Sequence, residues 1–290
     1  MAEEAWGRWG ADDERGALNL ISPDEVRRAV ALVASGEVLS LAQTISTAMM
    51  IPPHRPRMAH FMGRDGGDYA GGARRPGGFQ FAEDTVLLPL HLGTHIDCLC
   101  HSWYGDQLYN AFPGSSVRSS GATRCGAQTL GPIVTRGILL DFVRLTGAAL
   151  ADGAIIGVDL LRQAIAQAGT DIGKGDAVLL RTGWHEAHEV SGTVDFNSEP
   201  GLDVAAALVL AEVGVALVGA DNYAIEAMPF AQGTIFPVHQ RLIRDYGIPL
   251  LEGLVLKPLG ERAATQFLFM AAALPIAGAT GSPLAPVAVL

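Results

Sequence analysis

Short apolar segments alternate with helical segments along the second half of the chain. Residues 176–181 are strand-like, and the continuous apolar run at residues 215–219 is typical of a strand that is buried on both faces of a sheet. This alternation predicts an α/β protein with at least one largely buried sheet. The expected strands are 137–143, 176–181, 215–219, 248–256 and 266–274, and the expected helices are 158–168, 202–212 and 238–246.

The first half of the chain is less regular. Ser22-Pro23-Asp24-Glu25 predicts a helix start that combines a capping residue, a proline in the first turn and acids near the positive helix end. Strands are expected at residues 37–46 and 85–92. Residues 51–81 are rich in Gly, Pro and Arg, and a structureless segment of that length predicts a functional loop or lid. Nothing resembles an interdomain linker, so a single domain over residues 1–290 is expected.

Composition excludes several classes of protein. The chain is 49% hydrophobic and 17% charged, which is unlike a disordered chain, and its net charge of −10 argues against nucleic-acid binding. Every apolar run is interrupted well before the roughly 18 residues that a membrane span needs. The acidic N-terminus lacks the plan of a signal peptide, and three Cys suit a reducing compartment. We therefore expect a cytoplasmic protein with neither a nucleic-acid nor a membrane partner.

The most informative stretch begins at His91 and ends at His101. It also contains His95 and Asp97, and all four side chains have the same parity, so they would share one face of an extended strand. Four residues of strand nevertheless span about 13 Å, too far for two imidazoles to hold one ion. A kink at Gly93 would fold His91 back toward His95 and Asp97. Imidazole and carboxylate ligands predict a divalent metal site that suits Zn²⁺ or Mn²⁺.

Two thiols lie inside this stretch. Cys98 and Cys100 have the opposite parity, so we expect buried thiols that point away from the metal site. A zinc knot that combines both thiols with His101 is the alternative.

A second constellation lies near the C-terminus. Glu252 is a lone carboxylate in an apolar segment, and burying it ionised without a partner would cost several kcal/mol. His239 precedes it by thirteen residues, and a helix followed by a turn at Gly247 and a returning strand would bring the two together. The alternative is an edge strand that turns Glu252 toward water.

Aromatic residues follow the histidine stretch, and four further histidines lie outside any motif. The aromatic residues would form a wall for a flat substrate or pack in the ordinary way: Trp103, Tyr104, Tyr109 and Phe112. The histidines are expected at the surface: His54, His60, His185 and His188.

The stretch from His91 to His101 resembles the His-x-Gly-Thr-His-x-Asp-x-x-x-His signature of the cyclase-like metal-dependent hydrolases, which include bacterial kynurenine formamidase and isatin hydrolase. Other segments are similar to motifs of the longer subtype of this family: residues 9–10, 16–19, 180–184, 219–222 and 278–283, and His239 with residues 252–254. Cys98-Leu99 replaces the Ala-Pro of formamidase-like members, which argues against kynurenine formamidase itself.

The resemblance implies roles for six residues and a swivelling β/β/α fold. His91, His95 and Asp97 match the principal metal ligands. His101 matches either a ligand of a second zinc or the base of single-manganese members. The remaining two match a distal pair that completes the second metal site or supports the catalytic histidine: His239 and Glu252.

The expected activity is hydrolysis of an amide, lactam, formamide or lactone bond in a small cyclic or aromatic substrate. Metal-activated water would attack the carbonyl, and His101 would move the proton. One alternative is a biosynthetic cyclase or dehydratase with the same metal site, and another is a metal-binding protein without catalysis. The family resemblance also implies a homo-oligomer, either a dimer or a tetramer.

Overall fold

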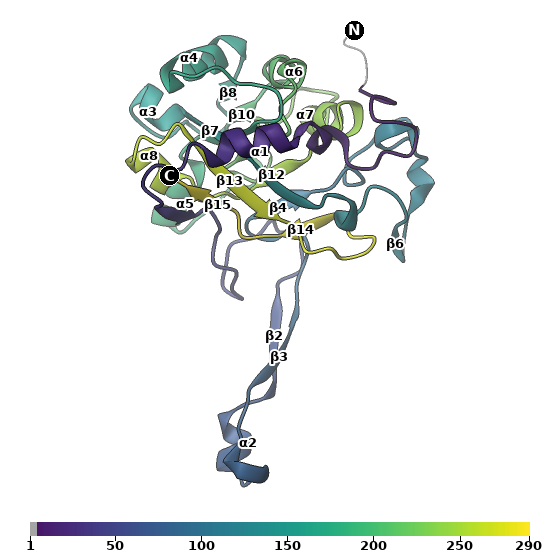
Figure 1. Ribbon diagram of the computed structural model, residues 1–290, viewed down its shortest axis with the longest axis vertical. Helices are drawn as coiled ribbons and strands as arrows, with labels where there is room; N and C mark the ends of the chain where they lie inside the picture. The colour runs from purple at the N-terminus through teal and green to yellow at the C-terminus, as the bar shows by residue number, and fades with distance from the viewer. Residues whose placement is uncertain (1–4) are drawn as a thin grey trace.

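A nine-stranded mixed sheet organises residues 5–290, the part of the chain that the computed structural model describes (Figure 1). Its strand order is β1-β15-β13-β7-β9-β11-β12-β4-β14, and the four strands β7, β9, β11 and β12 run parallel in its centre. The outer strands on both sides pair antiparallel. The bounds are β1 Val38–Ser40, β4 His95–Asp97, β7 Pro132–Asp141, β9 Ala177–Arg181, β11 Leu217–Ala220, β12 Leu250–Glu252, β13 Gln266–Ala272, β14 Gly281–Pro283 and β15 Val287–Val289.

Helical crossovers connect the central parallel strands. The chain passes from β7 to β9 through α3 and α4, from β9 to β11 through α5 and α6, and from β11 to β12 through α7 and a π-helical segment. The alternation predicted from the sequence is therefore confirmed as an α/β fold. The helices are α1 Pro23–Val30, α3 Phe142–Thr146, α4 Val158–Ala168, α5 Trp184–Ser191, α6 Val204–Val213, α7 Pro237–His239, the π segment Gln240–Asp245 and α8 Lys257–Glu261.

Local signals in the sequence explain where helices begin and end. Ser22 caps α1 by accepting a hydrogen bond from the Asp24 amide, and the Glu25 side chain accepts one in return from the Ser22 amide. Helix α4 has the predicted bounds, and Gly169 ends it in the left-handed conformation. The expected helix at 238–246 is split into α7 and the π segment.

Several expected strands are shorter than predicted or lie elsewhere. The predicted strands 37–46 and 248–256 are reduced to β1 and β12. The predicted strand 85–92 is confirmed only at residues 85–87, because β3 (Glu83–Leu87) ends at Leu87 and residues 88–94 form no strand. Short sheets pair β8 (Ile155–Ile156) with β10 (Gly201–Leu202) and β5 (Val117–Arg118) with β6 (Gly121–Ala122).

Residues 51–81 are not the structureless segment that their composition suggested. β2 (Ala59–Arg64) pairs antiparallel with β3, and the chain between them carries the short helix α2 (Gly66–Ala70). We refer to residues 59–87 as the arm. The arm projects away from the rest of the molecule, and α2 lies near its tip (Figure 1).

Among the described residues, no helix is both long enough and apolar enough to cross a membrane. The apolar core instead surrounds the central strands: Val178, Leu179, Leu217 and Val218 are fully buried. Three residues of the predicted site lie on neighbouring strands of this sheet, His95 and Asp97 on β4 and Glu252 on β12.

Candidate metal centre

Two neighbouring strands bring the sequence-distant site residues together. β4 lies between β12 and β14, and its antiparallel register with β12 places Glu252 opposite His95. Directly opposed residues share one face of a sheet, so the two side chains meet. The His95 Nε2 and Glu252 Oε2 atoms are 3.1 Å apart.

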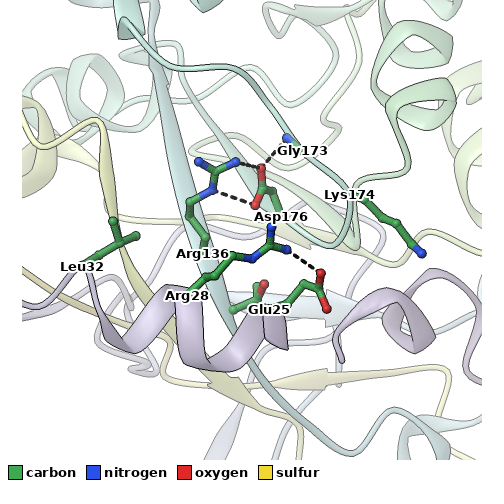
Figure 2. Close-up of a pocket in the computed structure, with 8 residues that line it drawn as sticks. Glu25, Arg28, Leu32, Arg136, Gly173, Lys174 and Asp176 are labelled. Carbon is green, nitrogen blue, oxygen red and sulfur yellow. Dashed lines mark hydrogen bonds and ion pairs between the residues drawn. The ribbon is translucent and has the colours of Figure 1, made fainter. Parts of the chain in front are cut away.

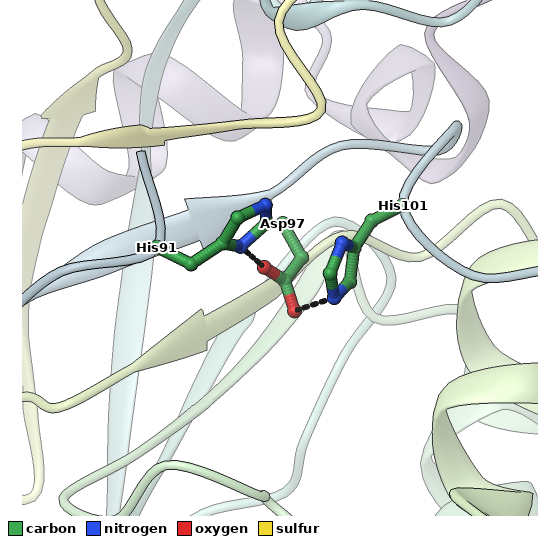
Figure 3. Close-up of side chains that lie close together, drawn as sticks. All are labelled: His91, Asp97 and His101. Carbon is green, nitrogen blue, oxygen red and sulfur yellow. Dashed lines mark hydrogen bonds and ion pairs between the residues drawn. The ribbon is translucent and has the colours of Figure 1, made fainter. Parts of the chain in front are cut away.

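The predicted kink at Gly93 is confirmed. Gly93 has a φ of +59°, a conformation that favours glycine, and the chain bends there before β4 begins. The bend brings His91 back to the site, where its Nδ1 lies 2.7 Å from Asp97 Oδ1 (Figure 3). His101 follows β4 in the chain and approaches the same carboxylate, with its Nε2 3.8 Å from Asp97 Oδ2.

The distal pair also joins this cluster. His239 Nε2 lies 3.1 Å from Glu252 Oε1 and 3.6 Å from Asp97 Oδ2. Glu252 is 1% exposed and lies in an interior strand of the sheet, so the alternative of a water-facing edge strand is wrong. The five other sequence-predicted residues therefore surround the Asp97 carboxylate.

The cluster has the donor atoms that a divalent ion requires. One group of ligand atoms belongs to His91, Asp97 and His101, another belongs to His95, Asp97 and Glu252, and within each group the atoms lie within 4.8 Å of one another. In the described structure, Asp97 Oδ2 is buried without a hydrogen-bond partner, and the 3.1 Å approach of His95 Nε2 to Glu252 Oε2 lacks the geometry of a hydrogen bond. Unpaired buried polar atoms are costly. Since both atoms face other metal-type ligands, the residues present fit a divalent ion.

Burial and close ionisable neighbours act in opposite directions on the pKa values of the cluster. Burial alone would raise the pKa of Asp97, but the imidazoles of His101 and His91 hold it well below its ordinary value. Burial lowers the pKa of His101 to about 4. For His239, burial is outweighed by bonds to Glu226 and Glu252, which raise its pKa to about 10. The site thus offers an ionised carboxylate at its centre and a neutral imidazole at His101.

The thiols do not belong to the ligand groups. Cys98 and Cys100 are free and buried, and burial raises the pKa of both, to about 12 for Cys100. Cys100 Sγ instead lies 3.8 Å from the Ala279 carbonyl oxygen. Among residues 5–290, the groups with metal-ligand geometry contain no cysteine, which agrees with the expected buried thiols rather than a zinc knot.

A cavity of about 250 Å³ adjoins the cluster. Trp184, Phe196 and Tyr223 form an aromatic wall whose ring centroids are 5.5–6.0 Å apart. Tyr223 connects this wall to the metal ligands, because its ring centroid is 6.2 Å from that of His95. The remaining lining residues are Gln43, Ala48, Met49, Met50, His185, His188, Glu189 and Val194.

This cavity corrects two expectations from the sequence. His185 and His188 line the cavity rather than the outer surface, whereas His54 and His60 are exposed as expected. The aromatic residues that follow the histidine stretch do not line it. Tyr109 is buried and donates to Asp13, and the Tyr104 hydroxyl donates to Asp245.

Sequence reasoning missed residues that support the ligands. Glu226 accepts hydrogen bonds from the His239 amide and approaches its Nδ1 at 2.7 Å, and Thr280 Oγ1 lies 3.1 Å from His91 Nε2. Such partners fix the orientation of metal-binding imidazoles. Glu226 follows the apolar pair Ala224-Ile225, so the signal used for Glu252 would have found it as well.

A second cavity, of about 400 Å³, is charged but lies apart from these ligands. Arg136 forms a two-pronged ion pair with Asp176, and Arg28 pairs with Glu25 (Figure 2). None of the six predicted site residues lines this cavity. The Arg136–Asp176 pair joins β7 to the turn before β9, and the Arg28–Glu25 pair lies within α1, so both have a structural role.

The cluster is buried, combines imidazoles with carboxylates, and has unpaired ligand atoms beside an aromatic cavity. It therefore defines a candidate metal centre on an α/β scaffold. Comparison with known proteins agrees. The family model described as "Putative cyclase" matches residues 39–227. A solved structure described as a novel cyclase is 34% identical, with 100% of both chains covered and a TM-score of 0.91. The chain therefore belongs to the cyclase family.

More distant structures share the fold. Isatin hydrolase A from Labrenzia aggregata, bound to benzyl benzoate, is 19% identical, with 91% of this chain and 98% of that chain covered and a TM-score of 0.65. Isatin hydrolase A from Ralstonia solanacearum is 23% identical, with 87% and 91% covered and a TM-score of 0.63. Comparison with curated proteins gives no match.

Proposed function

We propose that this protein is a metal-dependent hydrolase that opens a C–N bond in a small cyclic or aromatic substrate. Water would attack the carbonyl carbon of an amide, lactam or formamide. A lactone, in which a C–O bond is opened instead, is the corresponding oxygen substrate. The observation that carries the proposal is the Asp97 carboxylate, which is shared by two groups of ligand atoms and buried with one oxygen unpaired. The isatin hydrolases of similar fold act on a substrate of this class.

The proposed ligands are His91, His95 and Asp97 for one ion, Zn²⁺ or Mn²⁺, with His101, His239 and Glu252 available for a second. A bound divalent ion supplies Lewis acidity, which lowers the pKa of water toward about 7 and polarises a carbonyl group. Other residues of the chain fix the orientation of the ligand side chains. Glu226 and Glu252 fix the His239 ring between them, and Thr280 orients His91.

His101 is the proposed proton carrier. Its side chain is 30% exposed, compared with 14% for His91 and 0% for His95, so it is the most accessible of these three imidazoles. As a neutral imidazole it can accept the proton of the attacking water at Nε2 and donate it to the leaving nitrogen when the C–N bond breaks.

The aromatic cavity is the proposed substrate pocket. Trp184, Phe196 and Tyr223 offer flat apolar surface beside His95, while the Gln43 amide stands at the same wall and accepts from the Tyr223 hydroxyl. A cavity of about 250 Å³ suits a one- or two-ring molecule rather than a polymer.

Isotope incorporation tests the reaction. Metal-loaded enzyme should open cyclic and aromatic amides in ¹⁸O-labelled water, and the carboxylate product should gain one labelled oxygen that mass spectrometry detects. Prior treatment with a chelator should stop turnover, and added Zn²⁺ or Mn²⁺ should restore it. Product without the label would favour the cyclase or dehydratase alternative.

Shortening the aromatic wall tests the pocket. We expect Phe196→Ala to raise KM about 10- to 100-fold, because an aromatic contact and its buried area are lost, while kcat changes less. Steady-state kinetics on an identified substrate measures both. Trp103→Ala is the matched control, since Trp103 is an aromatic residue outside the cavity and is 38% exposed. An equal effect of the two variants would contradict the assignment of the pocket.

A further inference from the structure

Two residues in strained backbone conformations lie on the chain segment that leads from β11 to His239. Among residues 5–290, the residues other than glycine with a positive φ are Asp106, Asn110, Ala111, Cys125, Ile225, Phe236 and Ala263. Only Ile225 (φ +58°) and Phe236 (φ +45°) in this set carry a β-branched or aromatic side chain. For such residues the left-handed region is sterically unfavourable, so both conformations call for a physical reason.

The strained residue Ile225 places Glu226 against His239. Ile225 is fully buried, its amide donates to Asn222 Oδ1 over 3.0 Å, and its carbonyl accepts from the Leu202 amide. The next residue, Glu226, accepts from the His239 amide and lies 2.7 Å from His239 Nδ1. The bend at Ile225 thus helps to hold a carboxylate that supports His239.

The strained residue Phe236 places its own ring against the His239 imidazole. The two ring centroids are 4.9 Å apart at an interplanar angle of 67°, which is an edge-to-face arrangement. The Phe236 ring also packs on that of Phe230, with centroids 4.6 Å apart, and its carbonyl accepts from the Gln240 amide. A left-handed backbone therefore aims an aromatic ring at a residue of the candidate metal centre.

The ring contact supplies a restraint that the carboxylates around His239 do not. Glu226 Oε1 lies 2.7 Å from His239 Nδ1, and Glu252 Oε1 lies 3.1 Å from Nε2, so the two contacts fix the positions of the two nitrogens. Two fixed points define an axis, about which the imidazole plane can still turn. A ring that packs edge-to-face against the imidazole opposes this rotation. The plane matters because the Nε2 lone pair, through which an imidazole binds a metal ion, lies in it.

We propose that Phe236 is a positioning residue of the metal centre, held in a strained backbone conformation so that its ring fixes the plane of the His239 imidazole. The inference rests on the proposed function, in which His239 belongs to the site of a metal-dependent hydrolase. Strained residues cluster at active sites, where the strain is part of the pre-organisation of the site. The alternative is a packing role, in which the Phe236 ring only covers Phe230.

Alanine and glycine variants at position 236 isolate the strain. Both lose the ring, and only glycine adopts a positive φ without a steric cost. Phe236→Gly should therefore have a Tm about 1–3 °C above that of Phe236→Ala, whereas at an unstrained position glycine is the less stable of the two. Ala263→Gly is the matched control, since Ala263 is exposed after α8 and has a φ of +49°. It should raise the Tm by a similar amount and leave the kinetics unchanged.

NMR of the histidine rings measures the positioning in the metal-free protein, without turnover. The ¹⁵N signals of the His239 ring can be assigned by their loss in His239→Gln. They should be sharp in the wild type and broadened or doubled in Phe236→Ala, because an imidazole that turns between orientations is in exchange. Phe236→Tyr keeps the aromatic ring and should keep the wild-type signals.

Kinetics connects the restraint to the reaction. Phe236→Ala and Phe236→Gly should lower kcat by about 10- to 100-fold, the usual effect of losing a partner that orients a metal-binding imidazole, and should change KM little. Phe236→Tyr should keep the wild-type kcat.

Three results would each overturn the proposal. They are an alanine variant that is more stable than the glycine variant, unchanged His239 signals in Phe236→Ala, and full kcat in both variants. If the protein turns over no amide or lactone at all, the proposed function fails, while the order of the Tm values and the His239 signals still decide the role of Phe236.

Discussion

Asp97→Ala protein is expected to hold no tightly bound divalent ion and to have no measurable hydrolase activity. Asp97 belongs to both groups of ligand atoms, and the five other predicted ligands surround its carboxylate. Without Asp97, the imidazoles lose the anionic ligand that lies between them. An ion also loses the one ligand that the two groups share. Elemental analysis of purified protein should therefore fall from about one or two ions per chain to none.

The control variant replaces an aspartate that lies outside the site. Asp159 is exposed in the first turn of α4, and Asp159→Ala should keep the full metal content. Asp97→Asn preserves the shape of the side chain and should also lose the ion, with a circular dichroism spectrum like that of the wild type. Full metal occupancy in either Asp97 variant would remove the basis of the proposed site.

The second large effect is expected at His101. If His101 moves a proton and one ion is held by His91, His95 and Asp97, His101→Ala should keep its metal while kcat falls by about 10²–10⁴. We favour this result because His101 is the most exposed imidazole of those that face Asp97 and lies 3.8 Å from that carboxylate. Metal analysis and single-turnover kinetics on the same preparation measure both quantities.

Glu252→Ala distinguishes one ion from two. Glu252 shares its ligand group with His95, and His101 shares the other group with His91. In a two-ion enzyme each variant should therefore lose about one ion and keep the other. His54→Ala is the control, because His54 is exposed outside the site and should change neither quantity. If His101→Ala and Glu252→Ala both retained full activity, the catalytic assignment of these residues would be wrong.

Patterns within short segments were sufficient for the central fold. The bounds of α4 follow from its helical periodicity and from Gly169, and β9 and β11 follow from continuous apolar runs. The arm could not be read in the same way, because its strands are exposed and lie among glycines and prolines. An exposed ribbon has no burial pattern to reveal it, so the composition of residues 51–81 was typical of a loop.

The substrate pocket shows a similar limit. Aromatic residues close to the metal motif in sequence were natural candidates for a wall, but Tyr109 is buried in the core and bonds to Asp13. The wall instead comes from Trp184, Phe196 and Tyr223, which belong to three separate segments of the chain. Proximity in sequence says little about proximity across a sheet.

The sequence by itself determined the kinds of ligand and the bend that gathers them, because parity along a strand and a glycine at position 93 are local properties. Only the tertiary structure decided which ligand meets which. Glu252 faces His95 because β12 pairs with β4 in one particular register, and a shift of one residue would turn Glu252 to the other face. His239 lies at the end of α7 and approaches Glu252, and the chain between the two residues is a π-helical segment that local periodicity does not encode. Pairing between distant strands is set by the packing of the whole sheet, and that packing completed the site.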